Sequence, residues 1–369
     1  MNAVALTQEL VRIDTVNPSS PERPCAERVG KLLEDAGYAV KLHEFAPGRT
    51  SLVARREGED APFCFAGHLD TVPLGAARWS HGPFAGEIGE GKLYGRGSSD
   101  MKSGVAAMVA AALRLARARL RRGLTLVLVA GEETGCEGAA HLARTPGALG
   151  RAGALLVAEP TNNRPVVGHK GALWLRARVR GVTAHGSMPD RGVNAIYKAA
   201  RAVLKLAELR FEVPPDPLLG SPTVNVGTFA GGMNVNSVPD EATIGIDLRT
   251  IPSQRHAQVR AQLAALLGPE VELTPVVDLE GVRTQEDDPF VQRVRDALAE
   301  VTGARPDPAA ATYFTDASVL TPAYGGIPTV VLGPGEMALC HQTDEYCLVE
   351  RIDQAVETYV RIAQGWCGP

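Results

Sequence analysis

Histidine and acidic residues stand at wide intervals along the chain, each beside a short apolar run and a Gly- or Pro-containing turn. The segments read "FCFAGHLDTVP", "GRGSSDMKSG", "LTLVLVAGEETG", "GALLVAEPT" and "CHQTDEYC". The candidate side chains in them are His68, Asp100, Glu132, Glu133, Glu159 and His341. Two imidazoles and several carboxylates suit zinc or another borderline divalent ion better than magnesium or calcium, which prefer oxygen ligands alone. We therefore expect a hydrolytic metal site.

Three of these segments place the charged residue directly after a predicted buried strand. The apolar runs predict strands at 62–67, 124–130 and 153–158, and His68, Glu132 and Glu159 follow them closely. In open α/β sheets, ligands bind at the carboxyl edge of the strands. We expect these side chains to meet at that edge.

The adjacent carboxylates of Glu132 and Glu133 are costly at a buried sheet edge unless cations are present. One of them can ligate a metal while the other accepts a proton from water as a general base. The alternative interpretation is a solvated loop whose glutamates begin a helix.

His68 and Asp100 each have a second interpretation. Asp70 lies two residues after His68 and points to the same side, where a carboxylate commonly orients a metal-bound histidine. His68 is otherwise an ordinary hydrogen-bonded residue. Asp100 opens an Ala-rich helix, so it is either a helix N-cap or a carboxylate that bridges two metal ions.

The elements that must position these residues change in type along the chain. The first part, 1–171, alternates helices with apolar strands and predicts a mostly parallel sheet; its Ala-rich helix, from Met101, is expected to end at Gly123. Segments 172–287 alternate apolar and charged residues, which predicts an antiparallel sheet with two helices, around 193–209 and 254–267. The parallel pattern returns over 288–369 and completes the first domain.

Composition excludes several classes of protein. The 369 residues carry a formal net charge of −4, and the arginines of 114–122 occupy polar positions of a helix, so nucleic-acid binding gains no support. No apolar run is long enough for a signal peptide or a membrane span, so we expect no membrane partner and a cytoplasmic location. The six cysteines form no Cys-x-x-Cys pair and are assigned no role.

Taken in order, "GHLDTVP", "GRGSSDMKSG", "AGEETG", "AEPT", "GVTAHGSMPDRGVNAI", "GGMNVNSVPDEATIGIDLR" and "CHQTDEY" resemble the dinuclear zinc exopeptidases and amidohydrolases of the M20 peptidase group. The resemblance covers essentially the whole chain. It implies an α/β fold with a mostly parallel-sheet catalytic domain and an inserted α+β lid that also dimerises. The lid corresponds to 172–287.

The resemblance also implies two zinc ions per chain, with Co²⁺ able to substitute. Asp100 would bridge both ions, and a cis peptide would follow it. His68 and Glu159 would complete one coordination sphere, and Glu133 with His341 the other.

Further roles follow from the same resemblance. Glu132 would be the general base, and Asp70 would orient the metal-bound histidine. His185 would reach the active site of the neighbouring subunit of a homodimer, and Asn236 and Arg249 would bind the substrate carboxylate or carbonyl. From the sequence alone, these last three residues also fit a structural histidine, a turn residue and a solvated strand residue.

The substrate implied is an N-acyl amino acid or short peptide, most like that of the acetylornithine deacetylase branch. "CHQTDEY" resembles the histidine-glutamine-proline-aspartate-glutamate stretch of that branch, with Thr343 replacing the proline. The alternatives are succinyl-diaminopimelate desuccinylation, N-acetyl-lysine deacetylation, and dipeptidase or carboxypeptidase activity. A different class of alternative is a catalytically inactive relative that acts as a binding module.

Overall fold

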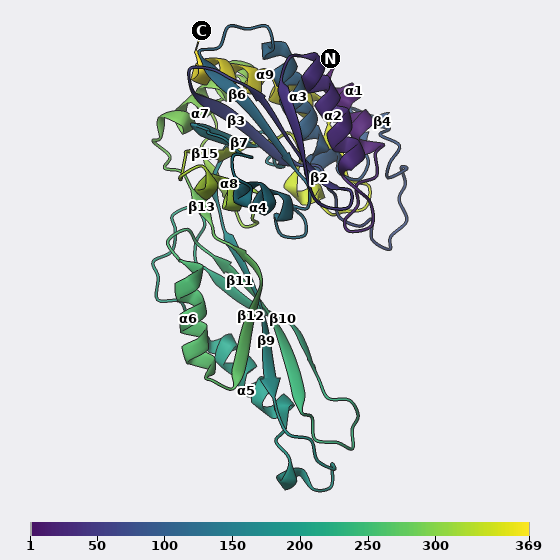
Figure 1. The fold of residues 1–369 in the computed structure, drawn as a ribbon, viewed down its shortest axis with the longest axis vertical. Coiled ribbons are helices and arrows are strands. Elements are labelled where there is room, and N and C mark those ends of the chain that lie inside the picture. Colours follow the sequence, from purple (N-terminus) through teal and green to yellow (C-terminus); the bar gives the residue numbers. More distant parts are fainter. Residues whose placement is uncertain (1, 369) are drawn as a thin grey trace. The chain divides into compact units, whose positions relative to one another are not determined.

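The computed structural model describes residues 2–368, which form two compact units. The larger unit runs from the start of the described chain to Gly168, and also comprises Arg283–Ala310 and the segment from Thr315 onward. The smaller unit comprises His169–Val282 and Ala311–Phe314. Each unit has its own sheet and its own hydrophobic core (Figure 1).

A large mixed sheet forms the centre of the larger unit, with the order β1-β2-β6-β3-β7-β15-β8-β13 and β14 beside β8. Its strands are β1 (Ala39–Ala46), β2 (Arg49–Arg56), β3 (Asp60–His68), β6 (Arg122–Val129), β7 (Ala154–Val157), β8 (Val166–His169), β13 (Val282–Arg283), β14 (Ala309–Ala311) and β15 (Thr329–Val331). The central strands β6, β3, β7 and β15 pair in parallel, so their carboxyl ends lie at one edge.

Helices cover this sheet on both sides. They are α1 (Ala3–Val11), α2 (Arg23–Asp35), α3 (Ser103–Leu115), α4 (Glu137–Arg144), α7 (Pro289–Thr302), α8 (Ala317–Ala323) and α9 (Val349–Cys367). Helices α3 and α9 pack against each other and against β3, while α4 and α8 lie on the opposite side (Figure 1). The core between sheet and helices includes Phe63, Phe65 and Tyr359, all fully buried. In the described chain, no helix is long and apolar enough to cross a membrane.

The Ala-rich helix is shorter than its sequence predicts. The prediction that it reaches Gly123 is wrong, because α3 ends at Leu115 and β6 already begins at Arg122. The reason is a contact from far away in the chain. The guanidinium of Arg56 donates hydrogen bonds to the carbonyls of Leu115 and Ala118, at 2.6 and 2.5 Å, and so satisfies backbone groups that a longer helix would have used itself.

Two small features complete the larger unit. A three-stranded sheet joins β16 (Tyr346–Leu348), β5 (Lys92–Tyr94) and β4 (Ile88–Gly89) in that order. A wide helical turn, η1 (Ser98–Lys102), precedes α3, and a short 3₁₀ turn, η3 (Met337–Leu339), precedes β16. Asp100 lies in η1, which follows β5, and His341 lies between η3 and β16.

The smaller unit is an antiparallel sheet with two helices on one face. The strand order is β10 (Thr223–Gly231), β11 (Glu241–Thr250), β9 (Gly171–Arg180) and β12 (Val271–Leu279). Alternate residues of β9 and β11 are buried against α5 (Ala195–Glu208) and α6 (His256–Leu267), as the alternating sequence predicts. A short 3₁₀ turn, η2 (Pro189–Arg191), lies before α5. The mixed α/β fold class expected from the sequence is confirmed.

Candidate metal centre and active site

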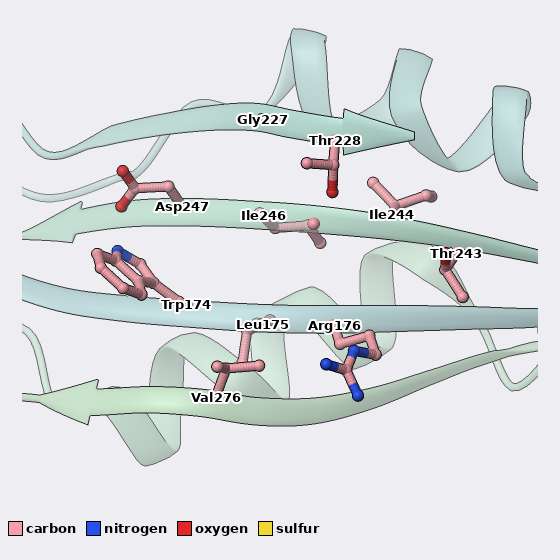
Figure 2. Close-up of a pocket in the computed structure, with 11 residues that line it drawn as sticks. Trp174, Leu175, Arg176, Gly227, Thr228, Thr243, Ile244, Ile246, Asp247 and Val276 are labelled. Atoms are coloured by element: carbon pink, nitrogen blue, oxygen red, sulfur yellow. The ribbon is translucent and has the colours of Figure 1, made fainter. Parts of the chain in front are cut away.

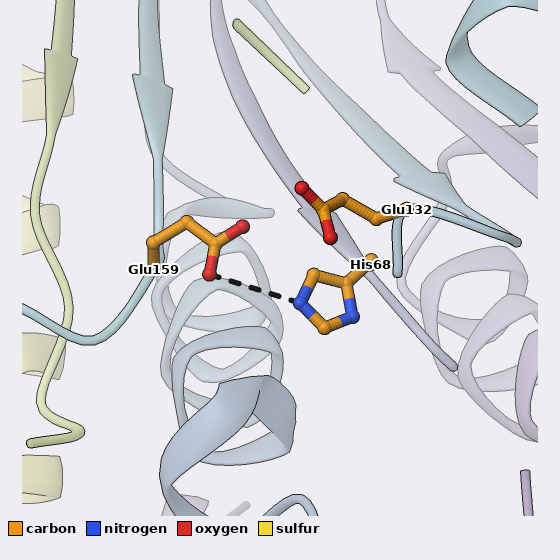
Figure 3. A group of neighbouring side chains, drawn as sticks. All are labelled: His68, Glu132 and Glu159. Carbon is orange, nitrogen blue, oxygen red and sulfur yellow. Dashed lines mark ion pairs between the residues drawn. The ribbon is translucent and has the colours of Figure 1, made fainter. Parts of the chain in front are cut away.

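The carboxyl ends of three neighbouring parallel strands bring the first group of side chains together. His68 is the last residue of β3, Glu132 follows β6, and Glu159 follows β7. All three are buried, with exposed fractions of 1%, 6% and 4%. Figure 3 shows the three side chains converging, with the imidazole of His68 paired to the carboxylate of Glu159 at 3.7 Å. The interpretation of Glu132 as part of a solvated loop is wrong.

Asp100 lies between two histidines. Its Oδ1 is 3.0 Å from Nε2 of His68, and its Oδ2 is 3.6 Å from Nε2 of His341. Nε2 of His341 is also 3.2 Å from the carboxylate of Glu133. Asp100 does not cap α3, whose N-cap residue is Lys102 without a side-chain capping bond. The expected cis peptide after Asp100 is present. Each oxygen of the Asp100 carboxylate therefore faces a different imidazole.

These side chains form two overlapping groups whose ligand atoms lie within 4.8 Å of one another: His68, Glu132 and Glu159, and His68, Asp100 and Glu133. An oxygen of Glu159, Oε1, is buried and has no hydrogen-bond partner in the described chain. Buried carboxylate oxygens need such a partner or a cation. The donor set of imidazoles and carboxylates fits a divalent metal ion.

Asp70 organises the strand ends behind this cluster. Its carboxylate accepts hydrogen bonds from the backbone N–H groups of Glu132 and Glu133, at 3.2 and 3.1 Å, and from the side-chain amide of Asn17. Nδ1 of His68 lies 3.0 Å from the main-chain carbonyl of Asp70 and 3.7 Å from its carboxylate. Asp70 therefore contacts the imidazole through its backbone, whereas its carboxylate holds the glutamate pair.

Protonation in the cluster reflects crowded negative charge. Burial raises the pKa of Glu159 to about 8, and burial together with the charge of Glu159 raises the pKa of Glu132 well above its usual range. Hydrogen bonds to Asp100 and Glu133 raise the pKa of His341 to about 10. Without a cation, protons must offset the charge that these carboxylates would otherwise carry.

Sequence reasoning missed two buried polar residues beside the cluster. Asn17 was not singled out, although its amide contacts Asp70. Asp316 lies at the start of α8, where its position resembles an ordinary helix cap, and burial raises its pKa to about 7. Cys136, which the sequence left without a role, has its thiol 3.9 Å from Oε1 of Glu132. A buried acidic residue can be recognised only once its neighbours are known.

The remaining predicted residues belong to the smaller unit. His185 is exposed, with Nδ1 2.8 Å from the Ser187 hydroxyl, and the N–H of Gly186 donates to the carbonyl of Asn236 at 2.7 Å. His185 and Asn236 are thus held on adjacent loop segments. Arg249, on β11, is paired with Asp247 at 3.0 Å, so it is not simply a solvated strand residue.

A shallow hollow of about 300 Å³ lies on the open face of the small sheet. Figure 2 shows the ring of Trp174 and the carboxylate of Asp247 side by side in it, from the paired strands β9 and β11. The guanidinium of Arg249 stands 5.8 Å from the centre of that ring. The aromatic and acidic neighbours of Arg249 therefore line a cavity on this face.

Comparison with known proteins agrees with this geometry. The family model for peptidase family M20/M25/M40 matches residues 64–365. The chain belongs to the M20 peptidase family. As an M20 protein with these buried ligands, it is a metal-dependent hydrolase of amide bonds.

Relatives of this M20 hydrolase include acetylornithine deacetylases. That of Myxococcus xanthus is 32% identical, over 99% of this chain and 97% of the relative, and that of Vibrio atlanticus (strain LGP32) is 28% identical, over 97% of both. Among solved structures, the M20 family metallo-carboxypeptidase Sso-CP2 from Sulfolobus solfataricus has a TM-score of 0.83 at 17% identity, over 99% of both chains. A tripeptidase from Staphylococcus aureus has a TM-score of 0.77 at 22% identity, over 98% of this chain and 97% of that one. These structures share the fold.

Proposed function

We propose that the protein is a dinuclear zinc amidohydrolase that removes the acyl group from an N-acyl basic amino acid, as an acetylornithine deacetylase does. One observation carries the proposal. The two carboxylate oxygens of Asp100 face different histidines, His68 and His341, as a ligand shared by two metal ions would. Near-full-length alignment with acetylornithine deacetylases supports the substrate class.

Five residues would hold the two ions. His68 and Glu159 would bind one ion, Glu133 and His341 the other, and Asp100 both. The partnerless Oε1 of Glu159 supports this assignment. When bound, the ions would polarise the amide carbonyl and make a water more acidic. Co²⁺ accepts the same imidazole and carboxylate ligands and would substitute.

Glu132 would move the proton. It would take a proton from the attacking water and deliver it to the leaving amine. Burial raises the pKa of Glu132, which suits a group that must hold a proton between these two steps. Its backbone N–H donates to the Asp70 carboxylate, and this bond holds the Glu132 backbone in place. Asp70 would also keep His68 oriented through its main-chain carbonyl.

The smaller unit would serve as a lid and a dimerisation domain. His185 would act on the scissile carbonyl in the active site of a second copy, and Asn236 and Arg249 would bind the substrate carboxylate or carbonyl. Exposed apolar side chains support a homodimer through this unit: Tyr197 and Leu204 on α5 are 66% and 64% exposed. Helix α5 packs against the edge strand β10, whose free edge also offers backbone groups for pairing with a second copy.

The choice of substrate has alternatives within the same family. Succinyl-diaminopimelate, N-acetyl-lysine and dipeptides would use the same metal ligands and general base. "CHQTDEY", with Thr343 in place of the proline found in acetylornithine deacetylases, supports that branch. A non-catalytic relative is the alternative from another class, but Glu132 and all five proposed ligands are present.

Metal content and amine release, measured together, test the proposal. The panel contains N-acetyl-ornithine, N-acetyl-lysine, N-succinyl-diaminopimelate, N-acetyl-methionine and several dipeptides. We expect about two zinc ions per chain, with N-acetyl-ornithine hydrolysed fastest. Preference for another substrate would change the substrate assignment but not the assignment of the metal ligands. A protein that binds no divalent metal and hydrolyses no amide would support the non-catalytic alternative.

A further inference from the structure

Arg96 and Glu345 form a buried ion pair that the proposed reaction does not use. Nη1 of Arg96 lies 2.6 Å from Oε2 of Glu345, and their side chains are 1% and 0% exposed. Burying two charges is costly unless further hydrogen bonds satisfy both groups. The positions of those further bonds indicate what the pair does.

The carboxylate of Glu345 binds the backbone of the turn that carries Asp100. Its Oε1 accepts hydrogen bonds from the N–H groups of Ser99 and Asp100, at 2.8 and 3.0 Å. Its Oε2 accepts one from the N–H of Gly97, at 3.1 Å. This turn, η1, has non-helical backbone angles at Asp100 and cannot satisfy these amides by itself. One carboxylate therefore holds two amides of the turn and that of its N-cap residue, Gly97.

The guanidinium of Arg96 binds the other two segments around the metal centre. It donates to the carbonyl of Gln342, next to His341, at 3.2 Å, and to the carbonyl of Pro73 at 3.1 Å. Pro73 ends the "HLDTVP" segment that begins with His68. The pair thus joins the three loops that carry His68, Asp100 and His341.

The surrounding backbone makes this junction rigid. Strands β5 and β16 pair directly beside it, with Tyr94 opposite Tyr346. The N–H of Gly95 also donates to the carbonyl of Glu345 at 2.9 Å. By contrast, the paired strands β3 and β7 also hold His68 and Glu159 at their ends, so the junction is not the only support of these two ligands. The loops of Asp100 and His341 depend on it most.

We propose that Arg96 and Glu345 are positioning residues that set the separation of Asp100 and His341 and so the affinity of the ion held by Asp100, Glu133 and His341. This inference rests on the proposed two-metal site. The other ion shares Asp100 but takes its remaining ligands from strand ends. Loss of the pair therefore weakens the His341 ion more than the ion held by His68 and Glu159.

Glu345→Gln is the first test. The amide keeps the size of the side chain, but its NH₂ group would face the N–H donors of Arg96 and Gly97 and cannot accept from them. It also leaves Arg96 without a counter-charge. Co²⁺ titration of metal-free protein, followed by visible absorption and equilibrium dialysis, should resolve two binding steps in the wild type. We expect one of the two steps, that of the ion held by His341, to lose about 10–100-fold in affinity, the range seen when groups that orient metal ligands are replaced, while the other step changes less.

Two further variants separate positioning from general destabilisation. Arg96→Met/Glu345→Gln removes both buried charges, so metal-free protein should regain thermal stability relative to Glu345→Gln. Its Co²⁺ affinity should stay low, because the bond to the Gly97 amide and the bond from Arg96 to the His341 loop are both lost. Glu9→Gln breaks a part-exposed pair with Arg28, between α1 and α2, and should leave both Co²⁺ steps unchanged.

The outcomes distinguish this inference from the proposed function. Wild-type protein that binds no Co²⁺ would overturn both. Two wild-type binding steps with unchanged affinities in Glu345→Gln would overturn only the positioning role. The role would also fail if the double variant recovered stability and Co²⁺ affinity together, or if both steps weakened equally.

Discussion

At the scale of single residues, Glu132 offers the sharpest test of the reaction. Glu132→Ala should lower kcat by about 10²–10⁴-fold, the usual contribution of a general base. Metal content should stay near that of the wild type, because the proposed ligand set does not include Glu132. The measurement is amine release together with metal analysis of the same sample.

The metal measurement is needed because a carboxylate oxygen of Glu132 lies within 4.8 Å of the ligand atoms of His68 and Glu159, so Glu132 could itself bind an ion. Loss of both ions from Glu132→Ala would assign Glu132 as a ligand rather than the base. Glu137→Ala is a matched control: this neighbouring glutamate is half-exposed and pairs with Arg49.

A second residue-scale prediction concerns pH. Burial and neighbouring charges raise the pKa of Glu159 from 4.5 to about 8, and hydrogen bonds raise that of His341 from 6.5 to about 10. Groups with raised pKa stabilise the folded protein below their unfolded pKa, and this stability is lost as pH rises through the folded pKa. A bound divalent ion would offset the negative charge that remains once these groups have lost their protons.

The rise in Tm that Zn²⁺ produces should therefore grow from about pH 6 to about pH 8. Asp100, whose pKa is lowered by its histidine partners despite burial, titrates below this window and does not change the sign. The measurement is thermal unfolding of metal-free and Zn²⁺-loaded protein across the range. A Zn²⁺ effect that shrinks with pH would contradict the assignment of Glu159 as a buried ligand.

At the scale of elements, Gly104 controls how closely α3 approaches the end of β7. A Cβ at this position would lie 2.2 Å from the carbonyl oxygen of Ala158, the residue before Glu159. Gly104→Ala should destabilise the metal-free protein by about 1–3 kcal/mol, the typical cost of overpacking, even though alanine favours a helix. The midpoint of urea unfolding measures this cost.

The same change should weaken Co²⁺ binding, because moving the start of α3 separates Asp100 from Glu159. Gly89→Ala is a suitable control, since the nearest atom to a Cβ there is 4.0 Å away. Unchanged stability in Gly104→Ala would mean that α3 can shift without cost.

Element boundaries also show what the sequence could not predict. Strand ends at His68, Glu132 and Glu159 were predicted, because a short apolar run followed by a turn is a local pattern. The end of α3 at Leu115 was missed, because it depends on Arg56, whose contact is distant in sequence. Local patterns define where an element can form, whereas long-range contacts determine where it stops.

At the scale of the whole molecule, the proposed dimer predicts complementation between inactive variants. His185→Ala and Glu132→Ala should each be inactive alone. A heterodimer purified with two different tags should have about half the activity of the wild-type dimer, because one of its two sites combines an intact Glu132 with the partner's His185.

A heterodimer without activity would place His185 in the active site of its own chain, whereas a fully active His185→Ala variant would place His185 outside any active site. Leu204→Asp supplies the control for assembly. This residue is exposed on α5, and a charge there should dissociate the dimer and abolish complementation. Sedimentation of the variants reports the oligomeric state directly.

The fold class, the family and a set of metal-suited side chains can be predicted from the amino-acid order, because these depend on periodicity, turn residues and short motifs. How those side chains meet follows from the folding of distant segments against one another. This folding placed Asp100 between two histidines, turned the Asp70 carboxylate toward the Glu132 and Glu133 amides, and buried Arg96 against Glu345. Burial and pairing of charges arise between segments far apart in the chain, so no local pattern contains them.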